Sequence, residues 1–209
     1  MLRPAGDTPG PTLTGLVLAG GQGRRMGGLD KGLIEIAGRP MIEHVLDALR
    51  PQVGALLINA NRNLERYAHY GCRVLSDAQA GYLGPLAGVA SALAVVETDL
   101  LLTAPCDSPL LAPDLAACLG RALERQQADL AVAHDGERQQ PVFLLLRRSL
   151  GADLDDYLAG GGRKIDQWLA RHRLAEADLS HRRDSFINVN DPGERQRVEA
   201  LLLSATPGA

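Results

Sequence analysis

The sequence predicts an α/β protein with a doubly wound, mostly parallel sheet, helices on both faces and an antiparallel addition in the C-terminal half. Two observations predict this class: short apolar runs typical of buried strands alternate with helical patterns, and proline or glycine marks many of the joints. Strands separated by helices imply crossover connections and parallel pairing. A length of 209 residues with 45% hydrophobic residues suits one large domain with its own core.

The first part of the chain alternates strands and helices. Each expected strand is short and almost wholly apolar, as in a sheet covered on both faces. Pro40 and Pro85 suit the first turn of a helix, where a missing N–H loses no hydrogen bond. The strands are expected at residues 13–19, 54–60, 73–76, 99–104 and 129–133, and the helices at residues 40–50, 64–70, 85–96 and 112–127.

The pattern changes after residue 133. Asp135-Gly136 between extended segments predicts a hairpin, which is the source of the antiparallel pairing. Asp191 is expected to cap the closing helix, with Pro192 in its first turn. The remaining elements are expected as a strand at 141–148, helices at 150–158 and 164–171, a strand at 185–189 and a helix at 192–203.

Domain organisation and setting follow from composition. We expect a flexible leader at residues 1–11, one domain at residues 12–203 and a tail at residues 204–209. No run is apolar and long enough for a signal peptide or a membrane span. The three cysteines form no CxxC pair, so neither a zinc ribbon nor a disulfide framework is predicted, and free thiols favour the cytoplasm.

The charge balance argues against a nucleic-acid-binding protein. The formal net charge is -3, whereas duplex binding needs clustered cations, and seven aromatic residues are few for a platform that stacks bases. Among 22 basic residues only Lys31 and Lys164 are lysines. Where nearly all other basic residues are arginines, a lysine suggests that its position needs a compact point charge.

The strongest motif runs from Leu18 to Lys31, directly after the first expected strand. Six of the 23 glycines lie between Gly20 and Gly32, so backbone N–H groups can turn toward an anion. The spacing fits neither the dinucleotide-binding G-x-G-x-x-G pattern nor the P-loop. We therefore predict a phosphate-binding loop that also carries Arg24 and Arg25; a solvated glycine-rich turn is the alternative.

Asp107 is the second candidate. It follows a buried strand and is bracketed by Pro105 and Pro109, which places its carboxylate at the same sheet edge as the glycine loop. A hard oxygen ligand beside bound phosphates suits Mg²⁺, although the aspartate could instead cap the next turn. Cys106 is expected to be a buried structural thiol, because no histidine lies nearby in the sequence.

Weaker polar candidates also follow expected strands. Their amides and carboxylates match the donor and acceptor edges of a base, yet each alone is more often a cap or a turn former. The stretch from Gly84 to Gly88 is expected to bring backbone to the same sheet edge; alternatively, it marks the tightly packed start of a helix. The five histidines are expected at surface or packing positions. The polar candidates are Asn59, Asn61, Asp77, Asn188 and Asn190.

Five motifs combine into a resemblance. They read Leu18-Ala-Gly-Gly-x-Gly-x-Arg-Met-Gly-Gly-x-Asp-Lys31, Ile58-Asn-Ala-Asn-Arg62, Gly84-Pro-Leu-Ala-Gly88, Pro105-Cys-Asp-Ser-Pro109 and Asn188-Val-Asn190. In order and spacing they resemble the molybdenum cofactor guanylyltransferases (the MobA family), nucleotidyltransferases with the Rossmann-like fold of nucleotide-diphospho-sugar transferases. The resemblance covers about residues 13–203.

The resemblance implies transfer of GMP from GTP to the terminal phosphate of molybdopterin or molybdenum-molybdopterin, with Mg²⁺ as cofactor and pyrophosphate as second product. A phosphate monoester is already anionic near neutral pH, so this acceptor needs no general base. Arg25, Lys31 and Asp107 are implied in catalysis, with Asp107 as the metal ligand. The implied binding residues are Leu18, Ala19, Gly20, Gly21, Gly23, Lys31, Asn59, Asp77, Gly84, Asp107, Asn188 and Asn190.

Other functions remain open. The nearest are a molybdopterin cytidylyltransferase and a sugar-phosphate nucleotidyltransferase, although Ala19-Gly20-Gly21 follows the guanylyl pattern. A different class is a carrier that binds a nucleotide or the cofactor without catalysis; the presence of both Lys31 and Asp107 favours an enzyme. The part up to about residue 133 is expected to bind GTP and the remainder the second substrate. Expected partners include chaperones that insert the cofactor and molybdoenzymes, and the chain is expected to be a monomer or a weak oligomer.

Overall fold

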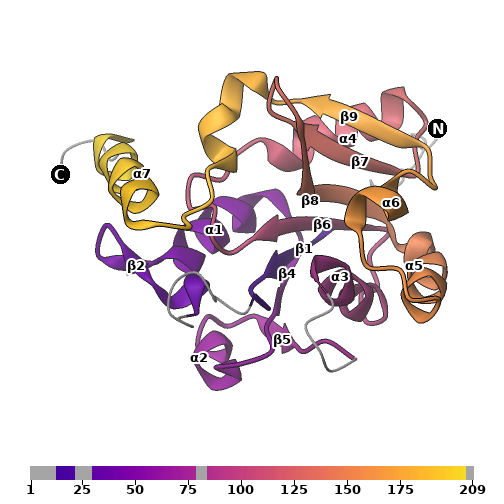
Figure 1. The fold of residues 1–209 in the computed structure, drawn as a ribbon, viewed down its shortest axis with the longest axis horizontal. Helices are drawn as coiled ribbons and strands as arrows, with labels where there is room; N and C mark the ends of the chain where they lie inside the picture. The colour runs from indigo at the N-terminus through magenta and orange to yellow at the C-terminus, as the bar shows by residue number, and fades with distance from the viewer. Residues whose placement is uncertain (1–12, 22–29, 79–83, 206–209) are drawn as a thin grey trace, which may run out of the picture.

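The computed structural model describes residues 13–21, 30–78 and 84–205. A seven-stranded sheet of order β5-β4-β1-β6-β8-β7-β9 runs through the molecule (Figure 1). Strand β8 pairs antiparallel with both of its neighbours, and the other pairs are parallel, which confirms the predicted class. The strands are β1 (Leu13–Leu18), β4 (Ala55–Asn59), β5 (Arg73–Leu75), β6 (Leu100–Pro105), β7 (Leu130–His134), β8 (Gln139–Arg147) and β9 (Leu174–Asp178).

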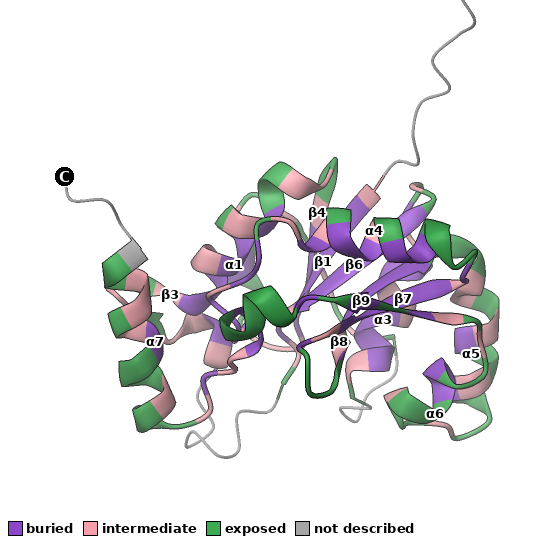
Figure 2. Cartoon of the chain, turned by 90° about the horizontal axis from the view of Figure 1, so that it is seen from above, coloured by how far each residue is buried: buried purple, intermediate pink, exposed green. Residues whose placement is uncertain are grey.

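Helices cover both faces of the sheet, and the strands between them are buried (Figure 2). A small antiparallel pair, which the sequence reasoning missed, precedes the first helix, and short 3₁₀ turns join several elements. The helices are α1 (Met41–Leu49), α2 (Leu64–Ala68), α3 (Pro85–Leu93), α4 (Leu115–Arg125), α5 (Gly151–Ala159), α6 (Ile165–Leu169) and α7 (Pro192–Ala205). The small strands are β2 (Glu35–Ile36) and β3 (Arg39–Pro40), and the 3₁₀ turns are η2 (Lys31–Leu33), η3 (Arg50–Gln52), η4 (Arg148–Leu150) and η5 (Ser180–Phe186). None of these helices is long and apolar enough to cross a membrane.

Two cores form because successive strand residues point to opposite faces. In β1, Val17 packs in one core with α1 and α4, whereas Leu16 packs in the other with α3, α5 and α6. A third, smaller cluster of Ile36, Met41, Val189 and Val198 seats α7 beside β2. The sheet is thereby held from both sides, and its strand ends keep a fixed position.

Most expected elements are confirmed, with ends that differ by at most three residues. Asp191 caps α7 as predicted: its Oδ1 accepts from the N–H of Gly193 at 2.8 Å and of Glu194 at 2.9 Å. Helix α7 continues to Ala205, so residues 204 and 205, which were expected to lie beyond the helix, are helical.

The strand expected at residues 185–189 is wrong. Residues Ser180–Phe186 form a 3₁₀ turn, and Val189 is tied to the sheet by one bond from its N–H to the carbonyl of Asp107 at 3.0 Å. The last strand is β9, which pairs parallel with β7. It carries the alternation of buried and exposed residues typical of a strand, but its inward residues are Ala175 and Ala177, whose hydrophobic signal is weak.

The hairpin at Asp135-Gly136 is confirmed, and it joins β7 to β8. Gly136 has φ +95, and a Cβ there would lie 2.9 Å from Ser180 Cβ, so the turn requires glycine. The register shifts between Val132 and Ala133, which leaves residues 141–143 without partners on β7. This β-bulge bends the start of β8.

Candidate active site

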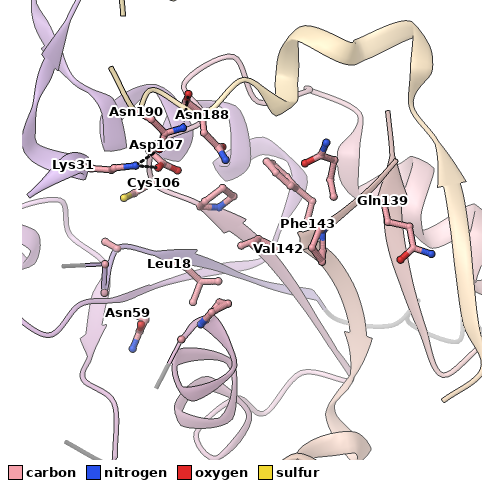
Figure 3. A pocket seen from close by; sticks show the side chains of 18 of the residues that line it. Leu18, Lys31, Asn59, Cys106, Asp107, Gln139, Val142, Phe143, Asn188 and Asn190 are labelled. Carbon is pink, nitrogen blue, oxygen red and sulfur yellow. Dashed lines mark hydrogen bonds and ion pairs between the residues drawn. The ribbon is translucent and has the colours of Figure 1, made fainter. Parts of the chain in front are cut away.

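A cavity of about 1040 Å³ lies at the carboxyl edge of the parallel strands (Figure 3). Open α/β sheets bind ligands at this edge. Eleven of the predicted site residues line it, namely Leu18, Ala19, Gly20, Gly21, Lys31, Asn59, Asp77, Gly84, Asp107, Asn188 and Asn190. Gly23 and Arg25 lie outside the described residues.

Lys31 and Asp107 meet at the centre of this edge. Lys31 Nζ donates to Asp107 Oδ2 at 2.9 Å and to Asn190 Oδ1 at 2.5 Å (Figure 3). The three side chains come from η2, from the end of β6 and from the segment before α7, so the fold brings together residues up to 159 positions apart. The predicted convergence of lysine and aspartate is therefore present in the structure.

These groups also fit a divalent cation. A carboxylate oxygen of Asp107 and an amide oxygen of Asn190 already approach one positive charge, the ammonium of Lys31. Hard oxygen ligands of this kind suit Mg²⁺. Asn190 is held from behind, because its Nδ2 donates to the carbonyl of Asn188 at 3.2 Å, and Asn188 is held in turn by Ser108 Oγ, which donates to its Oδ1 at 2.6 Å.

A second polar network lies at the ends of β4 and β5. Asn59 Nδ2 donates to Asp77 Oδ1 at 3.0 Å, and Asn61 Nδ2 donates to Asp77 Oδ2 at 2.8 Å. The N–H of Asp77 returns a bond to Asn61 Oδ1 at 2.9 Å. Gly20 and Gly88 leave room for Asn59, because a Cβ at either position would crowd its Oδ1. The network presents carboxylate and amide groups at a fixed position on the parallel side of the cavity.

The backbone before α3 reaches the cavity at Gly84. This residue has φ +85, a conformation that L side chains rarely adopt, and it precedes Pro85 at the first turn of the helix. Both residues line the cavity. The glycine therefore serves a close backbone approach as well as a helix start.

Cys106 is a structural thiol, in agreement with the sequence reasoning. It is 5% exposed, and burial raises the pKa of its thiol well above the usual value. Only the thiolate is an effective nucleophile. The cysteine therefore lines the cavity as a buried thiol whose raised pKa disfavours the thiolate.

Sequence reasoning missed the wall that faces the predicted residues. Thr103 Oγ1 donates to the carbonyl of Val142 at 2.6 Å and accepts from the N–H of Leu144 at 3.1 Å, which braces the bulge from β6. The predicted hairpin was the available signal, because a strand that returns antiparallel begins at the edge where the parallel strands end. The missed lining residues are Arg138, Gln139, Gln140, Pro141, Val142 and Phe143; Pro85, Pro105 and Cys106, which belong to the predicted motifs, also line the cavity.

One histidine lies near other metal-ligating groups. Ligand atoms of Asp114, Cys118 and His181 lie within 4.8 Å of one another. However, Arg121 donates to Cys118 Sγ at 3.1 Å, and Arg182 pairs with Asp114 at 3.4 Å. Arginines thus already contact Asp114 and Cys118, which makes this an ion-pair cluster around Asp114, consistent with the expected surface role of the histidine.

The sheet order, the glycine-rich exit from β1 and the polar groups at the strand ends define a nucleotide-binding α/β protein of the Rossmann-like class. Residues 15–176 match the model of the MobA-like NTP transferase domain. The chain belongs to the MobA-like NTP transferase family and is a nucleotidyltransferase.

Curated relatives agree with this assignment. A molybdenum cofactor guanylyltransferase of Shewanella sp. (strain ANA-3) is 51% identical over 187 residues, which cover 90% of this chain and 95% of that protein. The enzyme of the same name from Shewanella loihica is 47% identical over 192 residues, with coverage of 92% and 98%.

Solved structures share the fold. Molybdopterin-guanine dinucleotide biosynthesis protein A from Archaeoglobus fulgidus superposes with a TM-score of 0.77 at 24% identity, covering 91% of this chain and 99% of that one. A nucleotidyl transferase from Methanothermobacter thermautotroptrophicus gives a TM-score of 0.75 at 20% identity, covering 94% and 100%.

Proposed function

We propose that this protein transfers GMP from GTP to the terminal phosphate of molybdopterin, with or without bound molybdenum, and releases pyrophosphate. The observation that carries the proposal is the meeting of Lys31, Asp107 and Asn190 at the strand-end cavity. Relatives about 50% identical over most of their length bear the name molybdenum cofactor guanylyltransferase, which supports the same substrates.

The reaction requires positioning and neutralisation of charge. The acceptor phosphate attacks the α-phosphorus of GTP, the bond to the bridging oxygen breaks, and pyrophosphate leaves with that oxygen. Both substrates are anionic, so groups that hold the phosphates in line supply most of the catalysis. Lys31 contacts the triphosphate, together with Arg25 and the backbone of the glycine loop around Gly23.

Mg²⁺ is the proposed cofactor, with Asp107 as its principal ligand and Asn190 beside it. The ion neutralises phosphate charge when bound. Asp107 is 16% exposed and lies two residues beyond the end of β6, where its ion pair with Lys31 at 2.9 Å orients its carboxylate. Asn188 supports Asn190 and faces the cavity toward the second substrate.

The two substrates are proposed to occupy different walls. GTP lies along residues up to about 133, with its base near the network of Asn59, Asn61 and Asp77. Leu18 to Gly21 and Gly84 supply backbone at the same wall. Molybdopterin enters from the side of β8. Three free cysteines among the described residues support a reducing compartment, and we place the reaction in the cytoplasm.

Pyrophosphate release measured with each of the four NTPs, with and without molybdopterin, tests the function. We expect release with GTP only, and only when molybdopterin is present. Selectivity for CTP would identify a cytidylyltransferase, and release that depends on a sugar phosphate would identify a sugar-phosphate nucleotidyltransferase. GTP binding without release under any condition would identify a carrier.

A further inference from the structure

We propose that Tyr67 and Asp30 form a positioning pair that fixes Lys31 in the site; this inference rests on the proposed function. Asp30 directly precedes Lys31, and its side chain is only 6% exposed. Its carboxylate accepts from Tyr67 Oη at 2.5 Å and from Asn63 Nδ2 at 2.9 Å, and it pairs with Arg62 Nε at 3.5 Å. All three partners belong to the segment from the end of β4 to α2, so one short stretch of chain holds the carboxylate.

The backbone carries this constraint from Asp30 to Lys31. The N–H of Leu33 donates to the carbonyl of Asp30 at 3.0 Å, and the N–H of Ile34 donates to the carbonyl of Lys31 at 3.1 Å. Asp30 is thus the N-cap residue of the 3₁₀ turn η2, and a carboxylate held from the side sets where the side chain of Lys31 leaves the turn. The turn also lies directly on the phenol, because a Cβ at Gly32 would come within 2.7 Å of Tyr67 Oη.

The pair has no place in the cavity lining and therefore acts through its neighbour. Tyr67 is fully buried, and burial, with Cys106 and Asp30 nearby, raises the pKa of its phenol, which keeps it a protonated donor. Burying a carboxylate against a hydroxyl is costly compared with an apolar pair of similar volume, so packing alone does not account for this choice of residues. A role in positioning Lys31, the charged residue that follows Asp30, does account for it.

The segment that holds Asp30 also reaches the other end of the wall proposed to bind GTP. Asn59 and Asn61 hold Asp77, while Asn63 and Tyr67 hold Asp30. Residues 59–67 therefore join the carboxylate proposed to lie near the base to the lysine proposed to lie on the phosphates. A disturbance at Tyr67 is expected to act on GTP and to leave the acceptor unaffected.

The test is a double-mutant cycle of Tyr67→Phe with Lys31→Ala, with GTP affinity by calorimetry and steady-state rates as readouts. In the otherwise wild-type protein, Tyr67→Phe is expected to lower kcat/KM for GTP by about tenfold and to leave the KM for molybdopterin within about twofold, as for loss of a hydrogen bond to a charged group. In the Lys31→Ala background the same change is expected to add less than about twofold. Equal losses in both backgrounds would show a purely structural role and overturn the proposal.

Two further variants keep the test decisive. Tyr70→Phe is the matched control, because Tyr70 is a half-buried phenol whose ring lies 6.4 Å from that of Tyr67, and it is expected to change GTP affinity by less than about twofold. If Tyr67→Phe does not fold, Asp30→Asn removes the charge that the phenol supports and must show the same coupling to Lys31. If the wild-type protein releases no pyrophosphate with GTP, the proposed function is rejected. The coupling between Tyr67 and Lys31 is then still measured, from the affinity for whichever NTP the protein binds. If that affinity shows no coupling to Lys31, or if no NTP binds, the positioning role is overturned.

Discussion

The two walls of the cavity are built in different ways. On the wall of β4, β1 and β6, polar side chains such as Asn59, Asp77 and Asp107 lie at or just beyond the ends of parallel strands and are held by other side chains, as Asn59 and Asn61 hold Asp77. On the wall of β8, residues 141–143 belong to a bulge that is braced by Thr103 through backbone atoms. The first wall offers charges and amides held by other side chains, whereas the second combines Arg138, Gln139 and Gln140 with the bent, apolar surface of residues 141–143.

This difference matches the needs of two substrates. A triphosphate and a base are recognised by donors, acceptors and cations, which convergent strand ends supply. The wall with Pro141, Val142 and Phe143 supplies apolar surface, and Phe143 is set by an edge-on contact with Phe186 at 4.9 Å between ring centroids. Changes on the first wall should therefore act on GTP and changes on the second on the acceptor.

Asp107→Ala tests the junction of the two walls and has the largest expected effect. We expect kcat to fall about 10³-fold or more, because the variant loses the carboxylate proposed to bind Mg²⁺ and leaves Lys31 without its ion pair. Steady-state rates over a range of Mg²⁺ concentrations measure this, with circular dichroism to verify the fold. Asp114→Ala, which changes an aspartate of the ion-pair cluster, is the control. A folded Asp107→Ala protein with near-normal turnover would remove Asp107 from the site.

Thr103→Val tests whether the bulge shapes the acceptor wall. The change leaves the carbonyl of Val142 and the N–H of Leu144 without the hydroxyl that joins them, so we expect the free energy of unfolding to fall by about 2 kcal/mol. The KM for molybdopterin should rise about tenfold while GTP affinity stays the same. Thr14→Val is the control, because Thr14 is a buried threonine at the start of β1, away from the carboxyl edge. A weaker GTP affinity in Thr103→Val would show that the walls are not independent.

The sequence predicted the first wall far better than the second. Strand ends are visible in a sequence, since buried runs such as residues 100–105 stop at prolines and polar residues, and parallel order then brings Asn59, Asp77 and Asp107 together. The bulge in β8 arises from a register shift against β7, and its brace is a buried threonine that looks like any strand residue. Such tertiary pairing has no local signal.

The errors have the same cause. The segment before α7 carries apolar residues typical of a strand, but the edge position beside β7 is taken by β9. Ile187 and Val189 instead pack in the small cluster under α7, which leaves Asn188 and Asn190 facing the cavity. The two asparagines were found from their motif even though the strand expected before them is absent.

Asp135 provides a test of the turn that starts the second wall. Burial alone would raise the pKa of its carboxyl, but the N–H groups of Arg138 and Glu137 and the amide of Gln140 lower it to about 2. A depressed pKa stabilises the fold above the unfolded value of 3.8, and this contribution is lost as the pH falls toward 2. Urea unfolding of Asp135→Asn and wild type should differ by about 2 kcal/mol at pH 6, with the gap closing between pH 4 and pH 2. A gap that does not change with pH would contradict this account.

Asn61→Ala has the smallest expected effect and bears most directly on the contrast between the walls. Asp77 loses the amide donor at 2.8 Å and the acceptor of its own N–H at 2.9 Å, so that of these side-chain bonds only the one from Asn59 at 3.0 Å still holds its carboxylate. Calorimetry should show about tenfold weaker GTP binding, with the KM for molybdopterin unchanged. Ser76→Ala is the matched control, because it removes one hydrogen bond, to the carbonyl of Ala60 at 3.1 Å, from the same segment without touching the carboxylate. An equal loss for both substrates in Asn61→Ala would mean that β4 and β8 form one continuous binding surface, since only a shared surface passes a change at Asn61 to the acceptor.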